Sequence, residues 1–225
     1  MQGMTREPEQ LPPGRHGMSA SFVALNQRNR ILAAVAQVAD GKSYSDMTVE
    51  DLISAAGVSR RTFYEQFENK EMAFLAAYDE VVARLLRRVE EAVAAERELV
   101  ERVRAGIGAF LEFVALEPAV ARVCIVEVLA AGPEAVSRRR KTMRTFADVM
   151  ERTATVGEKP RVSPALTAET LVGGLHEVVY TRVLRGEAHK LPALLPDLVY
   201  SALMPYLGPE AAATERRRLV TAPSS

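Results

Sequence analysis

The stretch over residues 48–71 constrains the fold more than any other part of this chain, because its end signals mark two short helices. Thr48 and Asp51 form the pattern of a capping box, in which the hydroxyl accepts the amide of residue 51 and the carboxylate reaches back. Gly57 suits the left-handed position that ends a helix. Ser59 then caps a second helix. The pattern therefore predicts two short helices separated by a turn of about three residues.

Two short helices joined by a glycine turn describe a helix-turn-helix, whose second helix presents its N-terminal residues to the major groove of DNA. In this chain those residues are Arg60, Arg61 and Thr62, with Tyr64 one turn along. The guanidinium groups can pair with guanine or with phosphate. Taken alone, two arginines on a short helix are most often a solvated face. The caps and the turn favour the interpretation as a DNA reader.

The neighbouring residues indicate how this second helix is anchored. Phe63 and Phe67 lie at i and i+4 and are expected to face inward. Val58 and Phe63 stand at the two positions of a hydrophobic staple. Asn69 is placed to cap a long third helix.

Charge by itself does not identify a DNA-binding protein here. The whole chain has a formal net charge of zero, and residues 19–70 contain six basic and six acidic side chains. The case for DNA therefore rests on where the charges lie.

The rest of the chain reads as helices separated by Gly and Pro, with no sustained alternation of period two. The expected fold is all-α, a three-helix head followed by a helical bundle. The expected helices cover about 21–39, 48–55, 59–66, 69–95, 98–116, 119–131, 134–155, 164–186 and 191–207. The expected organisation is a disordered tail over 1–20, a helix-turn-helix domain over 21–68, a helical domain over 69–208 and a flexible tail over 209–225.

The segment quoted above resembles the DNA-binding domain of the TetR family over residues 26–75. The shared pattern is a Thr-capped helix, Ala-Gly-Val-Ser, Thr-Phe-Tyr, an aromatic residue and Lys-Glu. The resemblance implies a DNA-binding head followed by about six helices that form a ligand pocket and a dimer interface. Three residues depart from the pattern: Arg61 where Gly is frequent, Ile53 where a small Ala is usual, and Ser43 where Gly is common.

The resemblance also implies roles for single residues. Thr48 and Lys70 would contact phosphates, Tyr64 would contact the DNA backbone, and the remaining reader residues would contact bases or phosphates. Apart from the resemblance, the amides at the start of both short helices also favour phosphate. The predicted DNA-binding residues are Thr48, Ser59, Arg60, Arg61, Thr62, Tyr64 and Lys70.

Apolar stripes beyond residue 76 supply candidates for a ligand pocket. Met and Phe at helical spacing are usually core, and in a bundle that hosts ligands they also line the pocket. The candidates are Phe110, Phe113, Cys124, Met143, Phe146, Met150 and His176. His176 is either a satisfied interior histidine or a polar group in the pocket or dimer seam. Arg122 and Glu127 either contact ligand or face water.

Two adjacent glycines indicate a subunit interface. Gly173 and Gly174 lie inside an otherwise good helix, where each costs about 1 kcal/mol relative to Ala. Removing side chains lets another helix approach closely. Together with the segment 191–207, this predicts an interface of two helices from each chain. The predicted interface residues are Gly173, Gly174, Leu198 and Ala202.

The sequence gives little support to catalysis. It lacks a nucleophile elbow, a Glu-x-x-His pair and a phosphate-cradling glycine loop, so we expect no catalytic residue, no metal site and no cofactor. The single cysteine and the lack of a long apolar run favour a cytoplasmic protein with no membrane span. The leading hypothesis is a repressor that binds double-stranded operator DNA as a homodimer and is released by a small apolar or amphipathic effector. An enzyme on a helical bundle and a protein-binding adaptor are the alternatives.

Overall fold

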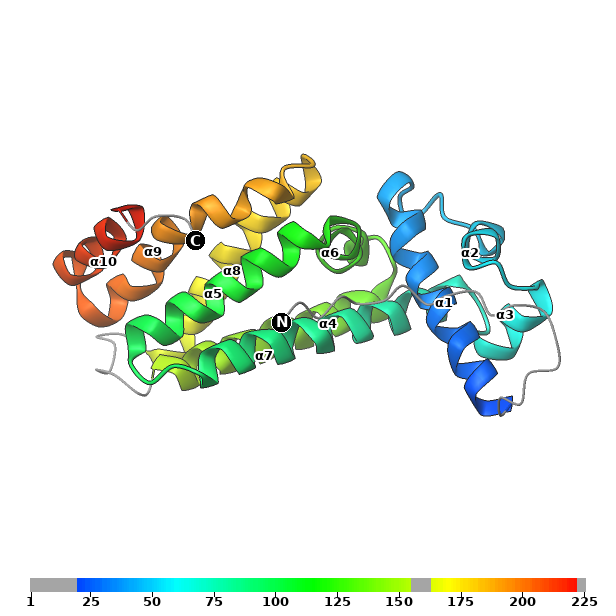
Figure 1. Ribbon diagram of the computed structural model, residues 1–225, viewed down its shortest axis with the longest axis horizontal. Coiled ribbons are helices and arrows are strands. Elements are labelled where there is room, and N and C mark those ends of the chain that lie inside the picture. The colour runs from blue at the N-terminus through cyan, green and yellow to red at the C-terminus, as the bar shows by residue number, and fades with distance from the viewer. Residues whose placement is uncertain (1–19, 155–162, 222–225) are drawn as a thin grey trace.

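A computed structural model describes residues 20–154 and 163–221, and this part of the chain contains helices and no β-strand (Figure 1). Residues 1–19 of the tail predicted over 1–20, residues 155–162 and residues 222–225 lie outside the described residues. The α-helices are α1 Ala20–Gly41, α2 Val49–Ala56, α3 Arg60–Gln66, α4 Lys70–Ala94, α5 Leu99–Leu116, α6 Pro118–Ile125, α7 Pro133–Ala154, α8 Pro164–Leu184, α9 Leu195–Leu207 and α10 Pro209–Thr221. Two 3₁₀ helices, η1 Glu127–Leu129 and η2 Ala188–Leu194, connect α6 to α7 and α8 to α9. The all-α prediction is confirmed for the described part.

Helices α1, α2 and α3 gather at one end of the molecule, which we call the head, and α4 to α10 form the longer body (Figure 1). The head packs around side chains that are fully buried, among them Ile31, Leu52 and Phe63. The same apolar cluster continues into the body through Phe74 and Tyr78 of α4. Because one core spans both parts, α4 supports the head rather than serving as a linker.

The local end signals of the head form as the sequence predicts. The Thr48 hydroxyl accepts the Asp51 amide, and the Asp51 carboxylate accepts the Thr48 amide at 2.9 Å. Hydrogen bonds from Lys42 and then from Thr48 lower the pKa of Asp51 to about 2, so the capping carboxylate is ionised at neutral pH. Gly57 has φ of 59° and ψ of 39°, a left-handed conformation in which a side chain would be strained.

The head and the body are also joined by one buried carboxylate. Glu127 of η1 is 3% exposed, and its Oε2 accepts the backbone N–H of Tyr44 at 2.7 Å across 83 positions of sequence. Its Oε1 pairs with Arg122 at 3.0 Å. Arg122 and Glu127 therefore neither face water as a free pair nor line a ligand site. They anchor the loop that precedes α2 to the end of α6.

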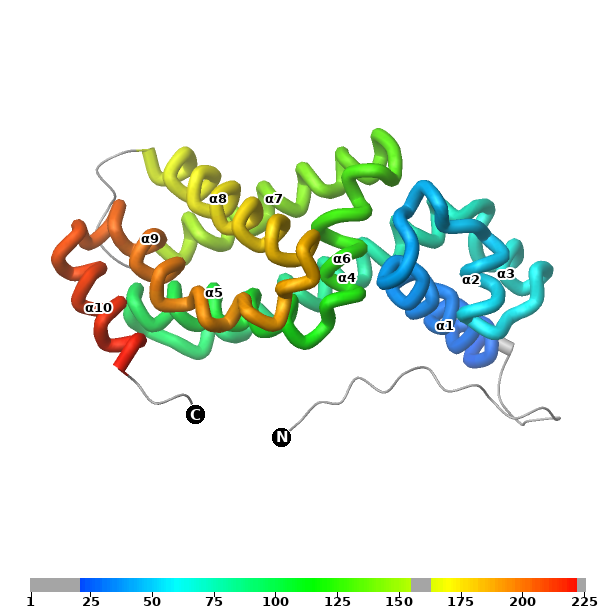
Figure 2. Tube along the Cα trace, turned by 90° about the horizontal axis from the view of Figure 1, so that it is seen from above, coloured from blue at the N-terminus to red at the C-terminus, as the bar shows by residue number. Residues whose placement is uncertain are grey.

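In the body, α4 packs against α5 and α7 packs against α8, and α9 and α10 lie at the end far from the head (Figure 2). Gly106 permits the approach of α5 to α4, since a Cβ there would lie 2.8 Å from Val93 Cγ2. The sequence predicted a flexible tail after Gly208, and this is wrong for residues 209–221, which form α10. Pro209 begins that helix, Ala212 is fully buried, and Arg216 forms an ion pair with Asp197 of α9.

Candidate DNA interface and ligand cavity

Helix α3 carries its two arginines on the open face of the head. Ser59 caps the helix by accepting the Thr62 amide at 3.0 Å, and its hydroxyl lies 2.8 Å from the Thr62 hydroxyl. The side chains of Arg60 and Arg61 are 66% and 89% exposed. They pair with Glu50 at 3.0 Å and with Glu65 at 2.8 Å. Exposed pairs of this kind are worth about 0–1 kcal/mol, so the guanidinium groups can exchange these partners for phosphate or bases.

The aromatic residues of this helix divide as the sequence predicts. Phe63 is fully buried and Phe67 is 6% exposed, whereas Tyr64 is 49% exposed. The rings of Phe63 and Tyr64 meet edge to face with centroids 5.5 Å apart. Burial of the two phenylalanines orients α3, and the Tyr64 hydroxyl remains on the outer surface of the head.

Lys70 has partners that the sequence did not reveal. Its ammonium donates to the carbonyls of Tyr44 at 3.0 Å, Met47 at 2.8 Å and Ser45 at 3.5 Å, and it lies 4.6 Å from the centroid of the Tyr44 ring. Three carbonyls occupy the three donors of the ammonium. The expected role of Lys70 as a phosphate contact therefore gives way to a structural one, because the side chain ties the start of α4 to the loop before α2.

Two further arginines of the head were missed by sequence reasoning. Arg30 of α1 donates to the carbonyl of Gly57 at 2.7 Å and to that of Ala56, so it holds the turn between α2 and α3. The guanidinium of Arg28 lies 4.6 Å from the centroid of the Phe67 ring. No local pattern could have identified these contacts, since each joins residues more than 25 positions apart.

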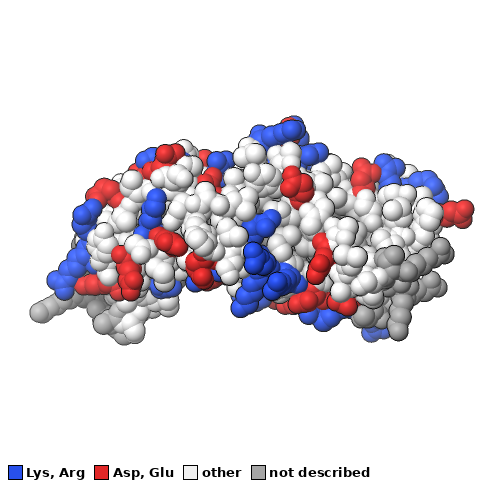
Figure 3. Space-filling view, turned by 180° about the vertical axis from the view of Figure 1, so that it is seen from behind, with Lys and Arg blue, Asp and Glu red and all other residues white. Residues whose placement is uncertain are grey.

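The surface charge agrees with the balance counted in the sequence. Seen from behind, basic and acidic side chains are mixed over the head, and basic side chains gather near the middle of the body (Figure 3). Within the described residues, no helix is long and apolar enough to cross a membrane, and no group of three His, Cys, Asp or Glu side chains is arranged to hold a metal ion.

A cavity of about 100 Å³ lies inside the body between α4, α5, α6, α7 and α8. Most of the predicted ligand residues line it: Phe110, Cys124, Met143, Phe146, Met150 and His176. The rings of Phe110 and Phe146 meet edge to face with centroids 5.9 Å apart. Cys124 is half-buried against the cavity, and burial raises the pKa of its thiol. This agrees with a small apolar role for the cysteine.

Phe113 does not line this cavity, so its prediction as a ligand contact is corrected. It is 4% exposed, and its ring lies below the guanidinium of Arg84 at 5.4 Å. The α5 residues that line the cavity run from Arg102 to Phe110, and Phe113 lies about one turn beyond them. The structure also places Ala202, 4% exposed, within the core of the single chain. Gly173 and Gly174 are exposed, and a Cβ added at either would meet no atom within 4 Å.

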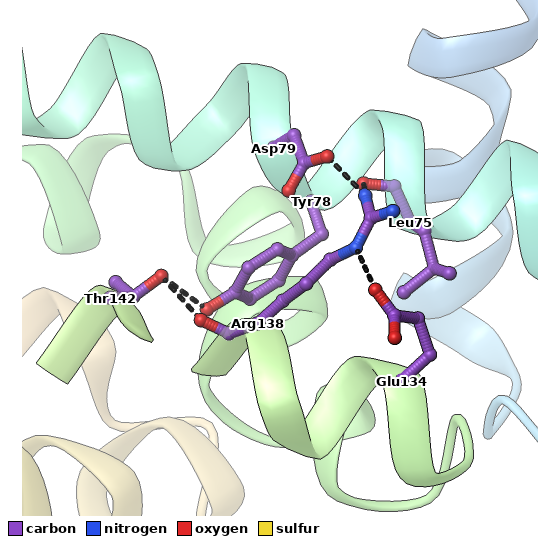
Figure 4. Close-up of polar contacts among 6 residues, drawn as sticks. All are labelled: Leu75, Tyr78, Asp79, Glu134, Arg138 and Thr142. Carbon is purple, nitrogen blue, oxygen red and sulfur yellow. Dashed lines mark hydrogen bonds and ion pairs between the residues drawn. The ribbon is translucent and has the colours of Figure 1, made fainter. Parts of the chain in front are cut away.

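Polar contacts join α4 and α7 at the end of the cavity nearest the head (Figure 4). The Tyr78 hydroxyl donates to Thr142 Oγ1 at 2.8 Å, and burial raises the pKa of Tyr78 to about 12. The Thr142 hydroxyl donates in turn to the carbonyl of Arg138 at 3.1 Å. The Arg138 guanidinium pairs with Asp79 and with Glu134. These contacts hold α4 and α7 together beside the head.

His176 lies at the same end, with its Nδ1 3.4 Å from Arg139 Nη2. An arginine can only donate, so Nδ1 accepts and the imidazole carries its proton on Nε2. Burial, followed by the charge of Arg139, lowers the pKa of His176 to about 4. The imidazole is therefore neutral at neutral pH.

Acidification is expected to destabilise the protein through His176. The ordinary pKa of histidine is about 6.5, and that of His176 in the folded chain is about 4, so the unfolded chain binds the proton more strongly. The stability is present above pH 6.5 and is lost as pH falls toward 4, at about 1 kcal/mol per pH unit. Thermal melts of wild type and His176→Gln between pH 6.5 and 4.5 measure the effect. The difference in stability should shift by about 2 kcal/mol in favour of the variant.

His189→Gln, at an exposed histidine, is the control. Parallel curves for wild type and His176→Gln would contradict the expected shift.

Comparison with known proteins places this architecture in a family. The family model "Bacterial regulatory proteins, tetR family" matches residues 31–77, which include α2 and α3 of the head. The chain is 28% identical over 204 residues to the HTH-type transcriptional regulator EthR of Mycolicibacterium smegmatis, a match that covers 88% of this chain and 91% of the relative. In fold it is similar to the fatty acid degradation regulator FadR from Bacillus halodurans, with a TM-score of 0.73 and 20% identity over 79% of this chain and 94% of that one.

A second solved structure has the same fold. FadR from Bacillus subtilis, determined in complex with stearoyl-CoA, is similar with a TM-score of 0.70 and 21% identity over 80% of this chain and 97% of that one. These relatives are regulators and not enzymes, which agrees with a chain whose strongest motif is a helix-turn-helix. The head motif, the match of residues 31–77 to the family model and the similarity to these regulators over most of the chain together support a DNA-binding transcriptional regulator of the TetR family.

Proposed function

We propose that this chain is a dimeric repressor that leaves its operator when a small apolar or amphipathic molecule occupies the cavity in the body. The observation that carries the proposal is that the cavity shares its walls with the support of the head. Tyr78 of α4 lines the cavity and belongs to the same apolar cluster as Phe63 of α3. Cys124 of α6 also lines the cavity and packs against that cluster. The complex of the Bacillus subtilis relative with stearoyl-CoA, an amphipathic molecule, supports the class of effector.

The head over residues 21–68 would read DNA through the first turn of α3. We assign base or phosphate contacts to Arg60, Arg61 and Thr62, and contacts to the phosphate backbone to Tyr64 and the N-termini of α2 and α3, where Thr48 and Ser59 stand. The exposure of both arginines and the burial of Phe63 behind them support this assignment.

The second copy would pack on α8 and α9. Large apolar side chains are exposed there, with Leu166 60%, Leu184 49% and Met204 45% accessible. Exposed apolar patches mark interaction surfaces. The bare backbone at Gly173 and Gly174 would allow a close crossing of α8 with its copy. Two heads related by a two-fold axis match the half-sites that helix-turn-helix dimers read.

The effector would act by changing the distance between the two heads. A molecule bound between α4 and α7 displaces α4 and with it the head. Because the two half-sites lie at a fixed spacing, two heads at a changed distance cannot both contact their half-sites. A coupling free energy of about 1–3 kcal/mol weakens DNA binding roughly 5–150-fold. Because linkage is reciprocal, operator DNA weakens effector binding by the same factor.

Fluorescence anisotropy with duplexes that tile the region upstream of its own gene tests the DNA-binding part. We expect one duplex to bind two chains and to bind about 10³-fold more tightly than a scrambled duplex, with affinity that falls as salt rises. Light scattering should report about twice the chain mass of 24.6 kDa. Binding that never exceeds that of the scrambled duplex would favour the protein-binding adaptor instead.

A further inference from the structure

Among the described residues, the lining of the cavity contains positive charge without a matching negative charge. The formally charged lining residues of this part of the chain are Arg102 of α5 and Arg139 of α7, and no described aspartate or glutamate lines the cavity. Among the described residues, neither arginine forms an ion pair, whereas Arg84 and Arg138 each pair with a carboxylate. A half-buried cation without an ionic partner is unfavourable unless another group supplies the negative charge. The lining therefore indicates what kind of molecule it accepts.

The two arginines have different surroundings. The Nε atoms of both are buried and lack a hydrogen-bond partner in the described structure. Arg102 Nη1 donates to the backbone carbonyl of Glu96 at 3.4 Å. Arg139 has instead the neutral imidazole of His176 beside it, whose Nε2 carries a proton. The site near Arg139 thus combines a guanidinium with a second N–H donor, which is the donor set that an anionic oxygen group accepts.

An apolar channel separates the two arginines. One stripe of α4 lines it from Tyr78 to Val93, and this separation of 15 positions at 1.5 Å rise spans about 22 Å. Arg139 lies at the Tyr78 end, since its charge influences the Tyr78 hydroxyl and the next turn of α7 contacts that hydroxyl through Thr142. Arg102 lies at the other end, one turn before Gly106, which packs on Val93.

We propose that the cavity binds a molecule with an apolar chain that ends in an anionic group, and that Arg139 and the Nε2–H of His176 hold this group at the end nearest the head. This inference rests on the proposed function and specifies its effector. The anion would receive charge-assisted hydrogen bonds, and the chain would extend along α4 toward Val93. The bound anion would also lie beside the Tyr78, Thr142 and Arg138 contacts that join α4 to α7 (Figure 4). Binding would thereby alter the part of α4 that supports the head.

Isothermal titration calorimetry with three molecules of equal chain length tests the proposal. Dodecanoate carries the anion at the end of the chain, dodecanol replaces it by a neutral hydroxyl, and dodecanoyl-CoA carries its negative charge on a large distal group. We expect wild type to bind dodecanoate at least about 10-fold more tightly than dodecanol and more tightly than dodecanoyl-CoA. Arg139→Gln should reduce the preference for dodecanoate over dodecanol to about 1, and the matched Arg102→Gln should retain it.

A second measurement keeps the test independent of how well the variants fold. With ¹³C at the carboxyl carbon of dodecanoate, NMR follows the protonation of the bound ligand in wild type. A guanidinium beside the carboxyl lowers its pKa, so the bound signal should titrate at lower pH than the free one. His176→Gln should retain binding of dodecanol and weaken that of dodecanoate.

Several outcomes would overturn the proposal. The first is equal affinity of wild type for dodecanoate and dodecanol, and the second is a preference for dodecanoate that is lost in Arg102→Gln and kept in Arg139→Gln. The third is tighter binding of dodecanoyl-CoA that is unaffected by Arg139→Gln. The fourth is a bound carboxyl group that titrates at the same pH as the free one. Operator binding measured on the same samples separates the two claims. A wild type that binds operator and none of the three molecules removes this inference alone, and a wild type that binds the carboxylate and no DNA removes the proposed repressor.

Discussion

Replacement of Arg60 and Arg61 together by alanine is expected to weaken operator binding more than about 100-fold. Each bidentate arginine–guanine pair is worth about 1–3 kcal/mol, and a dimer loses the pair at both half-sites. Both side chains are more than half exposed and held only by surface carboxylates, so their removal leaves the core of the head intact. Anisotropy titrations with the operator, and with operators altered at one position, measure the loss and assign each arginine to a base.

The control is Arg97→Ala, which removes one positive charge from an exposed position in the turn between α4 and α5, at the far end of the body. It should leave operator affinity within about twofold of wild type, since charges beyond a Debye length of about 10 Å are screened. Glu50→Gln removes the surface partner of Arg60 and should bind at least as tightly as wild type. If the double variant binds operator with the affinity of wild type, α3 is not the recognition helix.

Glu127→Ala is expected to lower the free energy of unfolding by about 3–5 kcal/mol, because one partner of a buried ion pair is removed and the other remains. The change leaves Arg122 without its carboxylate and the Tyr44 amide without its acceptor. For a chain of this size the expected drop in Tm is about 2–4 °C per kcal/mol. Chemical denaturation and thermal melts measure the loss. Operator affinity should also fall, although Glu127 is remote from α3 in sequence, because the loop that leads into α2 is released.

Two further variants separate the two contacts of Glu127. Glu127→Gln keeps an oxygen that can accept the Tyr44 amide and loses the charge opposite Arg122, so its loss of stability should be smaller than that of alanine. Glu112→Ala removes an exposed carboxylate that pairs with Arg88 at 3.2 Å, and about 0–1 kcal/mol is expected there. A Glu127→Ala variant as stable as Glu112→Ala would mean that the contacts of Glu127 with Tyr44 and Arg122 do not hold the head to the body.

The sequence by itself determined the features that depend on residues within one or two turns of each other. The capping box at Thr48, the left-handed Gly57, the cap at Ser59 and the inward side of Phe63 all form as predicted. Each is governed by short-range hydrogen bonds and backbone sterics, which the local sequence determines. The outer face of α3, with both arginines, follows from the same local geometry. The resemblance to a family then extended these local predictions to the fold of the whole chain.

Only the tertiary structure decided which side chains meet across long separations in sequence. Helical periodicity indicates that a face is apolar and does not say which helix covers it. For that reason Phe113, three residues from Phe110, could not be excluded from the cavity, and α10 could not be distinguished from a tail. The carbonyls around Lys70, the contact of Glu127 with Tyr44, and the convergence of Arg102 and Arg139 on one cavity each join residues from separate helices or loops. These contacts exist because packing of apolar faces brings the helices together, and the buried polar groups then take the partners that packing places within reach.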